Sequence, residues 1–175
     1  MIKYIADLHL GHFNVIKYDN RPFSSVEEMD KTIIDNWNNT VMDTDDVYII
    51  GDVCFGNNPE KYIKQLRGKK HLIIGNHDKE ILKKCRSYFE TIDYYKKIYD
   101  DNKAIILCHY PMAEWDGMFR ESYHIYGHIH NALNDTYYIM KNRDLAFNAG
   151  CMINNYTPVT LNELITNNNN FRREH

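Results

Sequence analysis

The sequence predicts an α/β fold in which two packed β-sheets are flanked by α-helices, and two patterns lead to this prediction. Short Ile-rich apolar runs alternate with amphipathic helical segments along the first part of the chain, which is typical of layered α/β folds. Short strand-like runs then cluster in the second part, which favours a second sheet packed on the first. The chain has 175 residues, 43% of them hydrophobic, and this is sufficient for one domain with its own core.

Buried strands are expected where short apolar runs end in polar or glycine residues, because a strand covered on both faces is apolar throughout. Four such runs cover residues 2–6, 47–50, 71–74 and 104–108. Shorter strands are expected over residues 123–126, 137–140 and 145–148, and a Tyr-rich strand is expected over residues 91–99.

The clearest helix is predicted from about residue 26 to residue 42. Ser24 and Glu27 form a candidate capping box, in which each side chain satisfies an unpaired backbone N–H group. Apolar residues then recur at helical spacing and predict the face toward the core: Val26, Met29, Ile33, Ile34, Trp37 and Val41. Further helices are expected over residues 59–66 and 79–85.

The domain is predicted to cover residues 1–166, since the chain contains no internal repeat and no Pro/Gly/Ser-rich linker. A run of four asparagines begins at Asn167 and is followed by five more residues. This composition predicts a flexible C-terminal tail over residues 167–175.

Composition and charge argue against several classes of protein. The net charge of −3 and the pI near 6.3 give no general attraction to nucleic acid or anionic membranes. No apolar run approaches the roughly 18 residues needed to span a bilayer, and the N-terminal residues lack the features of a signal peptide. The four cysteines are far apart and without Cys-x-x-Cys spacing, which predicts reduced thiols in a cytoplasmic protein and no thiolate zinc site.

Five short polar motifs each follow a predicted strand. In chain order they are Asp7-Leu8-His9, Gly51-Asp52, Gly75-Asn76-His77-Asp78, His109 and Gly127-His128-Ile129-His130. Sites in α/β sheets form at the carboxyl ends of the strands, where several loops converge. A glycine before the polar residue lets the backbone turn sharply away from the strand. We therefore expect these side chains to meet at one edge of the fold.

The residue types in these motifs match a binuclear metal site. Carboxylate, imidazole and amide oxygen ligands suit manganese, iron, nickel or zinc. Residues two apart in an extended segment point to the same side, so that Asp7 with His9, and His128 with His130, can face the metals together. A single histidine is more often structural than a ligand, and the prediction therefore depends on the five motifs as a set.

The ordered set of motifs resembles the calcineurin-like metallophosphoesterase superfamily. The resemblance covers Asp7 to His130, and the segments around His12, Arg21 and Tyr156 are similar to a small single-domain bacterial and phage branch. It implies two packed sheets flanked by helices and two divalent metal ions, with manganese expected and iron, nickel or zinc as alternatives. It also implies the ligands: Asp7, His9 and His130 for one metal, Asn76, His109 and His128 for the other, and Asp52 as a bridge.

The resemblance further implies that His77 is the general acid, beside the metals and not bound to them. Asp78 is expected to orient His77, because an imidazole needs a partner on its second nitrogen. Arg21 and His12 are candidates for substrate binding, with Arg120 as a weaker candidate. Arg21 has the alternative of bracing the loop before the first long helix.

Two aromatic residues between His109 and His128 have open roles. Trp115 and Phe119 either form a wall of the pocket or pack in the core. Arg120 and His124 are otherwise expected to be solvent-facing or structural.

The predicted function is a metal-dependent hydrolase of phosphodiesters, including nucleotide-derived ones, or of phosphomonoesters, through a metal-activated hydroxide. The Gly-Asn-His-Asp motif is similar to phosphodiesterase and nuclease branches of the superfamily. A nuclease acting on short nucleic acid and a non-catalytic binding module are the alternatives. The expected partner is a small phosphoester substrate and not a membrane, while nucleic-acid binding and homodimer formation stay open.

Overall fold

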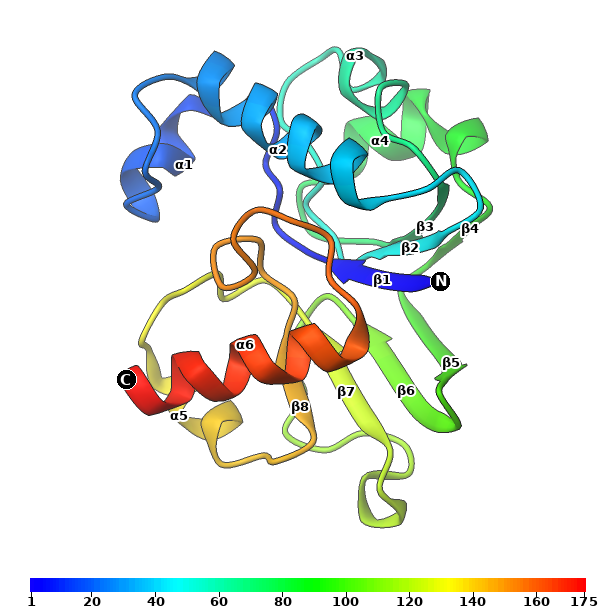
Figure 1. The fold of residues 1–175 in the computed structure, drawn as a ribbon, viewed down its shortest axis with the longest axis vertical. Helices are drawn as coiled ribbons and strands as arrows, with labels where there is room; N and C mark the ends of the chain where they lie inside the picture. Colours follow the sequence, from blue (N-terminus) through cyan, green and yellow to red (C-terminus); the bar gives the residue numbers. More distant parts are fainter.

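Two four-stranded β-sheets form the centre of the protein in the computed structural model, which describes residues 1–175 (Figure 1). The first sheet is parallel and contains β1 (Ile2–Ile5), β2 (Asp46–Ile49), β3 (Lys69–Ile73) and β4 (Thr91–Asp93) in that order. The second contains β5 (Tyr95–Asp100), β6 (Lys103–Cys108), β7 (Tyr123–Tyr126) and β8 (Ala146–Asn148), and only β5 is antiparallel to its neighbour. The predicted fold class is confirmed.

Helices cover the outer sides of both sheets (Figure 1). The first sheet carries α1 (Phe13–Tyr18), α2 (Val26–Thr40), α3 (Glu60–Ile63) and α4 (Lys79–Lys84). The second carries α5 (Asp135–Lys141), while α6 (Leu161–Glu174) contacts both β8 and β1, which are edge strands of the two sheets. Two short 3₁₀ helices, η1 (Arg86–Tyr88) and η2 (Met118–Arg120), complete the elements. No helix is both long and apolar enough to span a bilayer.

The alternation of side chains along the strands explains the layering. In β1, Ile5 packs with the helices of the first sheet, whereas Tyr4 packs in the core between the sheets. In β6, Ile105 faces the same central core and Ile106 packs toward α5. Successive residues of a strand point to opposite faces, so each strand contributes to two cores.

The predicted long helix forms as α2, and its cap differs from the prediction by one residue. Ser25 is the N-cap and accepts a hydrogen bond from the backbone N–H of Glu28, while the Glu28 carboxylate accepts from Ser24. The apolar stripe is confirmed, since Met29, Ile33 and other members are buried in the first core. Two adjacent serines, each followed three residues later by glutamate, made either register compatible with the sequence.

Two predicted strands differ in the structure. Residues 137–140 are part of α5 and not a strand, because the Asn134 side chain caps the helix by accepting from the Tyr137 N–H group. Tyr137 and Met140, three residues apart, both pack on the second sheet, which is helical spacing. Residues 91–99 form two strands: the chain leaves the first sheet at the end of β4 and enters the second as β5.

The C-terminal residues are helical where a flexible tail is predicted. Helix α6 continues to Glu174, and Asn168 is buried. The Asn168 side chain bonds to the backbone of Asn148 at the end of β8, and Phe171 packs against the apolar cluster between the second sheet and α5. These tertiary contacts order a segment whose composition resembles a solvated tail.

Candidate metal centre

All seven predicted metal ligands lie together at the carboxyl ends of five strands. Asp7 and His9 follow β1, Asp52 follows β2, and Asn76 follows β3. From the second sheet, His109 follows β6, and His128 and His130 follow β7. The convergence arises because the parallel strands of both sheets end on the same side of the molecule.

One group of donors consists of Asp7, His9 and His130. Their donor atoms all lie within 4.8 Å of one another. The Nε2 atoms of His9 and His130 are 3.1 Å apart, and His130 Nε2 is 3.8 Å from Asp7 Oδ1. A carboxylate and two imidazoles at these distances can hold one metal ion.

A second group surrounds the amide of Asn76. Asn76 Oδ1 lies 3.1 Å from His109 Nε2 and 3.1 Å from His128 Nδ1. Asp7, Asp52 and His109 also have donor atoms within 4.8 Å of one another. This group offers amide oxygen, imidazole and carboxylate ligands to a second ion.

Asp52 lies between the two groups. Its Oδ2 atom is 3.7 Å from His9 Nε2 in the first group and 3.6 Å from His109 Nε2 in the second. One carboxylate oxygen at nearly equal distance from both groups is the arrangement that a bridging ligand requires.

The backbone of the site is strained at the ligands themselves. Five of the eleven non-glycine residues with positive φ in the protein are predicted ligands: Asp7, His9, Asp52, His128 and His130. The left-handed region costs an L-residue about 1–2 kcal/mol. Such strain concentrates at functional sites, where the surrounding structure holds it in place.

Glycines in two of the motifs allow close approach of the ligands. Gly51 has a φ of +83°, and a Cβ atom there would lie 2.3 Å from His109 Nδ1. A Cβ atom on Gly75 would lie 2.3 Å from Asp52 Oδ1. Any larger residue at either position would displace a predicted ligand.

The hydrogen bonding of His9 differs from that of a structural histidine in the same protein. Buried His124 uses both ring nitrogens, with Ile106 O at 3.1 Å and the Met112 N–H group at 3.1 Å. The Nδ1 atom of buried His9 has no partner, and its Nε2 atom faces only another imidazole within hydrogen-bond distance. This pattern leaves the Nε2 lone pair free for a metal ion.

The electrostatics of the site also fit metal ions. Burial raises the pKa of the Asp7 carboxyl to about 6 and lowers the pKa of the His9 imidazole to about 2. A divalent cation binds a charged carboxylate and a neutral imidazole, and it supplies the positive charge that buried Asp7 lacks. The donor set and its protonation therefore suit a divalent metal centre.

Asp19, which belongs to none of the predicted motifs, orients one of these histidines. Its Oδ1 atom is 2.8 Å from Nδ1 of His130, the nitrogen opposite the one that faces the site. Burial opposes the charge on His130, but the hydrogen bond to Asp19 and the charge of Asp7 raise its pKa. Metal-binding histidines commonly have such a carboxylate partner, yet the chain has 24 acidic residues and its sequence does not single out this one.

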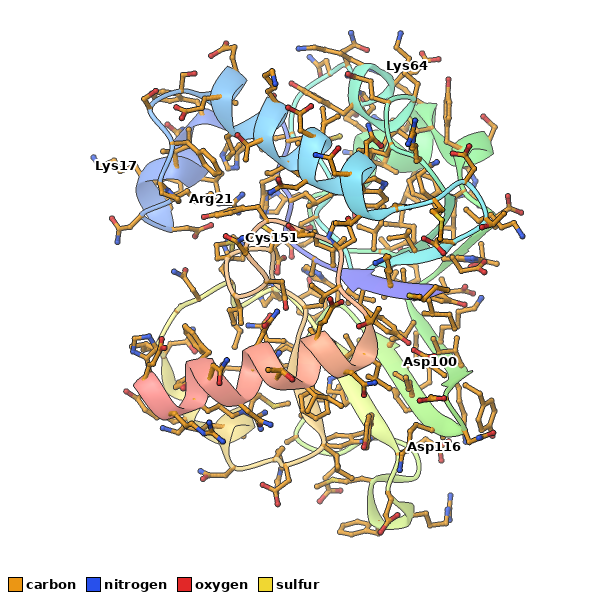
Figure 2. The ribbon with its side chains drawn as sticks, viewed as in Figure 1. Lys17, Arg21, Lys64, Asp100, Asp116 and Cys151 are labelled. Atoms are coloured by element: carbon orange, nitrogen blue, oxygen red, sulfur yellow. The ribbon has the colours of Figure 1, made fainter.

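Arg21 braces the site and does not face it, so the prediction of substrate binding is wrong. Its side chain is fully buried beside α1 (Figure 2) and pairs with Asp19 at 2.9 Å. It also donates hydrogen bonds to the carbonyl oxygens of Leu8 and Asp7, each at 2.9 Å. These contacts tie the loop before α2 to the segment after β1, as a brace would, and they extend through Asp19 to His130.

Asp78 is buried and does not orient His77. Its two carboxylate oxygens accept hydrogen bonds from the backbone N–H groups of Asp52, Val53 and Gly75, at 2.8–2.9 Å. The predicted contact fails because Asp78 turns into the protein while the side chain of His77 stays exposed. Asp78 instead joins the loop after β2 to the loop after β3.

His77 and His12 lie at the rim of the centre. The His77 ring centroid is 5.5 Å from that of His9, and the His77 backbone N–H group donates to Asp52 Oδ1 at 2.8 Å. The His12 ring is also 5.5 Å from His9 and stacks on Phe55 at 4.2 Å. The structure thus places both beside the donor groups and outside them.

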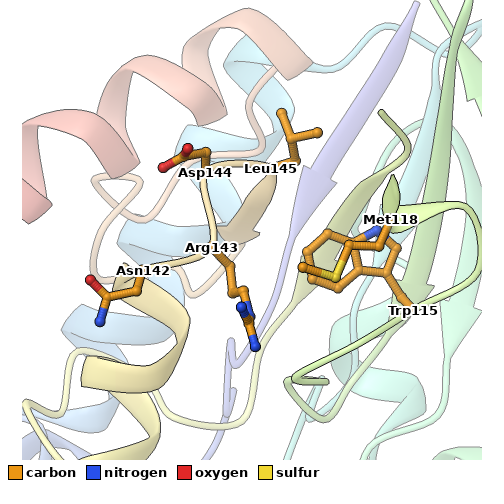
Figure 3. A pocket seen from close by; sticks show the side chains of 6 residues that line it. All are labelled: Trp115, Met118, Asn142, Arg143, Asp144 and Leu145. Atoms are coloured by element: carbon orange, nitrogen blue, oxygen red, sulfur yellow. The ribbon is translucent and has the colours of Figure 1, made fainter. Parts of the chain in front are cut away.

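Beyond His109, the residues of the loop between β6 and β7 take no part in the donor groups. Trp115 is buried in the apolar cluster between the second sheet and α5. It lines a cavity of about 220 Å³ with Met118 and with Arg143, which lies between α5 and β8 (Figure 3). Phe119 is 87% exposed, so it belongs neither to the core nor to a pocket wall. The Arg120 side chain is exposed and lies 3.6 Å from Asp116 on the surface.

Comparisons with known proteins support the fold and assign no activity. No family model matches the sequence. An uncharacterized protein of Methanocaldococcus jannaschii is 37% identical over 168 residues, which cover 94% of this chain and 89% of that protein. A solved protein of unknown function from Aquifex aeolicus has a TM-score of 0.76 at 27% identity, over 95% of this chain and 98% of that chain. An E. coli phosphoesterase has a TM-score of only 0.44 at 16% identity, over 85% and 77% of the two chains.

Proposed function

The chain belongs to the family of the uncharacterized Methanocaldococcus jannaschii protein, and we propose its activity from the site itself. We propose that it is a metal-dependent phosphoesterase. The observation that carries the proposal is the position of Asp52 Oδ2, 3.7 Å from His9 and 3.6 Å from His109. A shared carboxylate between two sets of nitrogen and oxygen donors supports a binuclear hydrolase. Manganese, iron, nickel and zinc all suit these ligands.

Asp7, His9 and His130 would hold one ion, and Asn76, His109 and His128 the other, with Asp52 common to both. When bound, such a pair of ions polarises the phosphate and lowers the pKa of water near to neutrality. The protein side chains supply what the ions do not: fixed positions for the ligands and a proton for the leaving group. We propose phosphodiesters as the preferred substrates, with phosphomonoesters as the alternative.

His77 is proposed as the general acid. Its ring is exposed at the rim, and its backbone is tied to Asp52, so the imidazole lies beside the donors without joining them. A proton from this ring would go to the leaving oxygen as the P–O bond breaks, which contributes typically about 10²–10⁴-fold. We expect His77→Ala to slow hydrolysis of alkyl esters strongly and of 4-nitrophenyl esters weakly, because nitrophenolate leaves without protonation.

The test is removal and return of metal. Protein stripped with a chelator would be assayed against bis(4-nitrophenyl) phosphate and 4-nitrophenyl phosphate, with manganese, nickel, zinc or magnesium added in turn. The expected result is loss of turnover on stripping, recovery with a transition metal, and faster hydrolysis of the diester. Folded protein that binds metal and hydrolyses neither ester with any metal would contradict the proposal and favour a binding module.

A further inference from the structure

Two cavities border the loop that carries Asn76 and His77. One has a volume of about 330 Å³ and is lined by Asn76, and the other has a volume of about 370 Å³ and is lined by His77. Lys79 lines both. Each volume is within the range of about 300–1,000 Å³ that small-molecule sites have, so each can take one organic group.

Each cavity has an exposed aromatic wall that rests on a histidine, either a ligand of the centre or a histidine at its rim. In the Asn76 cavity, Tyr110 is 47% exposed and its ring packs edge-on against His128 at 4.6 Å. In the His77 cavity, Phe55 is 46% exposed and stacks on His12. Aromatic rings held in place with one face open are suited to stack on flat ligand groups.

Lys79 is the unpaired cation between the two cavities. The two other lysines of α4, Lys83 and Lys84, both pair with Glu80, at 2.9 Å and 3.1 Å. Lys79 has no ion pair and is exposed at the start of the helix. A free ammonium between two aromatic-walled cavities can pair with the phosphate that joins two flat groups.

On the basis of the proposed function, we propose that the substrate is a phosphodiester with a flat aromatic group, such as a nucleobase, on each arm. The arm to be released lies against Phe55, because His77 lines that cavity and supplies the proton to its oxygen. The arm that stays on phosphorus lies against Tyr110. Water adds to phosphorus, the P–O bond to the Phe55-side arm breaks, and the products are an alcohol and a phosphomonoester.

The experiment compares substrates that share one leaving group and differ in the retained arm. Metal-loaded protein would be assayed with bis(4-nitrophenyl) phosphate and with methyl 4-nitrophenyl phosphate. We expect kcat/KM to be at least about fivefold higher for the first, since stacking of one ring is worth about 1–3 kcal/mol. Tyr110→Ala should remove this preference, whereas Tyr110→Phe should keep it.

Phe55→Ala should raise KM for both diesters alike, because their leaving groups are identical. Lys79→Ala should lower kcat/KM for both, while Lys83→Ala should not. Tyr138→Ala is the aromatic control, since Tyr138 is 50% exposed on α5 and lines neither cavity. The preference is a ratio of two rates on one protein, so a general loss of folded protein does not alter it.

The outcomes separate this inference from the proposed function. Equal kcat/KM for the two diesters in the wild type, or a preference that survives Tyr110→Ala, overturns the two-arm inference and leaves the phosphoesterase in place. Absence of turnover on every ester with every metal overturns the proposed function and this inference with it.

Discussion

The two halves of the candidate metal centre differ in how firmly their ligands are held. In the first half, Asp7 and His9 are buried, and His130 is oriented by Asp19, which pairs in turn with Arg21. In the second half, Asn76 and His128 are exposed, and His109 is the buried ligand, with its Nδ1 atom 2.8 Å from the carbonyl oxygen of Ile50. The first half is therefore braced and the second is open.

The difference indicates that the two groups of ligands have different roles in one centre. A braced, buried group loses little entropy when it binds an ion, and we expect it to bind the tighter of two metals. An open group adjoins the cavities lined by Asn76 and His77, where a substrate would arrive. Asp52 connects the halves, and each prediction below tests whether they are as unequal as the structure indicates.

The largest effect is expected from Asp52→Ala, because this residue serves both halves. Loss of a partner that only orients a ligand typically costs about 10–100-fold in metal affinity, and loss of a ligand shared by two sites costs at least that at each. We expect turnover to fall by about 10³-fold and metal stoichiometry to drop below two. Metal content and kcat report the effect. Asp116→Ala, which changes an exposed acidic residue, is the control. If Asp52→Ala turned over substrate as fast as the wild type, the binuclear site would be excluded.

The second prediction concerns pH in the braced half. Burial raises the folded-state pKa of Asp7 from 3.8 to about 6, so the metal-free protein binds an extra proton that the unfolded chain releases. The contribution of Asp7 to stability is therefore complete below about pH 3.8 and is lost as pH rises from there through about 6, by about 3 kcal/mol over the whole range. Bound metal removes this loss because it pairs with the charged carboxylate.

Urea unfolding with and without manganese, at pH 5 and pH 7.5, measures this effect. Stabilisation by metal should be larger at the higher pH in the wild type. In Asp7→Asn, which carries no titrating group at this position, the increase with pH should be much smaller. An equal increase in both proteins would show that Asp7 is not the group responsible.

The third prediction separates the halves directly through Asp19→Asn. The asparagine keeps the shape of the side chain but loses the charge that pairs with His130 and Arg21. We expect the tighter of the two metal affinities to fall by about 10–100-fold, with a much smaller change in the weaker one. Calorimetric titration of stripped protein measures both. Asp35→Asn, exposed on α2, is the control, and equal weakening of both sites would mean that the bracing is not local.

The contrast between the halves also explains which parts of the site were predictable. The ligands follow directly after strands, so the order of motifs in the chain was sufficient to bring them to one edge. Asp19 comes from the end of α1 and meets a histidine 111 residues away, a contact set by packing that leaves no pattern in the sequence. Asp78 shows the opposite error: it neighbours His77 in sequence, but its side chain points to the backbone of other loops.

Local composition misled where tertiary contacts outweigh it. Residues 137–140 have the aromatic and β-branched content of a strand, yet a capped N-terminus and the packing of Tyr137 and Met140 on the second sheet make them helical. The asparagine run predicts a flexible tail through its low-complexity composition alone. Only the fold shows that one of the four asparagines is buried.

The smallest effect is expected from Asn168→Ala, which tests whether α6 belongs to the braced half. Asn168 accepts a hydrogen bond from the Asn148 N–H group at 2.7 Å and donates one to the Asn148 carbonyl at 2.9 Å. The Asn148 side chain in turn donates to the carbonyl oxygen of His130 at 2.7 Å. Removing the Asn168 amide takes the partner from the buried Asn148 N–H group and leaves the Asn148 carbonyl with a long bond from Asn154 Nδ2 at 3.5 Å. This should cost about 1–3 kcal/mol of unfolding free energy.

The neighbouring Asn169→Ala is the matched control, because Asn169 is exposed in the same run and should change stability by less than about 0.5 kcal/mol. Urea unfolding of the metal-free variants measures this difference, and equal stabilities would contradict the role of Asn168. Metal titration of the same proteins then sharpens the comparison. If Asn168→Ala lowers stability but leaves the tighter metal affinity within about threefold, the bracing of His130 ends at Asp19 and Arg21. A larger loss of that affinity extends it through Asn148 to α6, so that the helix formed by the supposed tail becomes part of the centre.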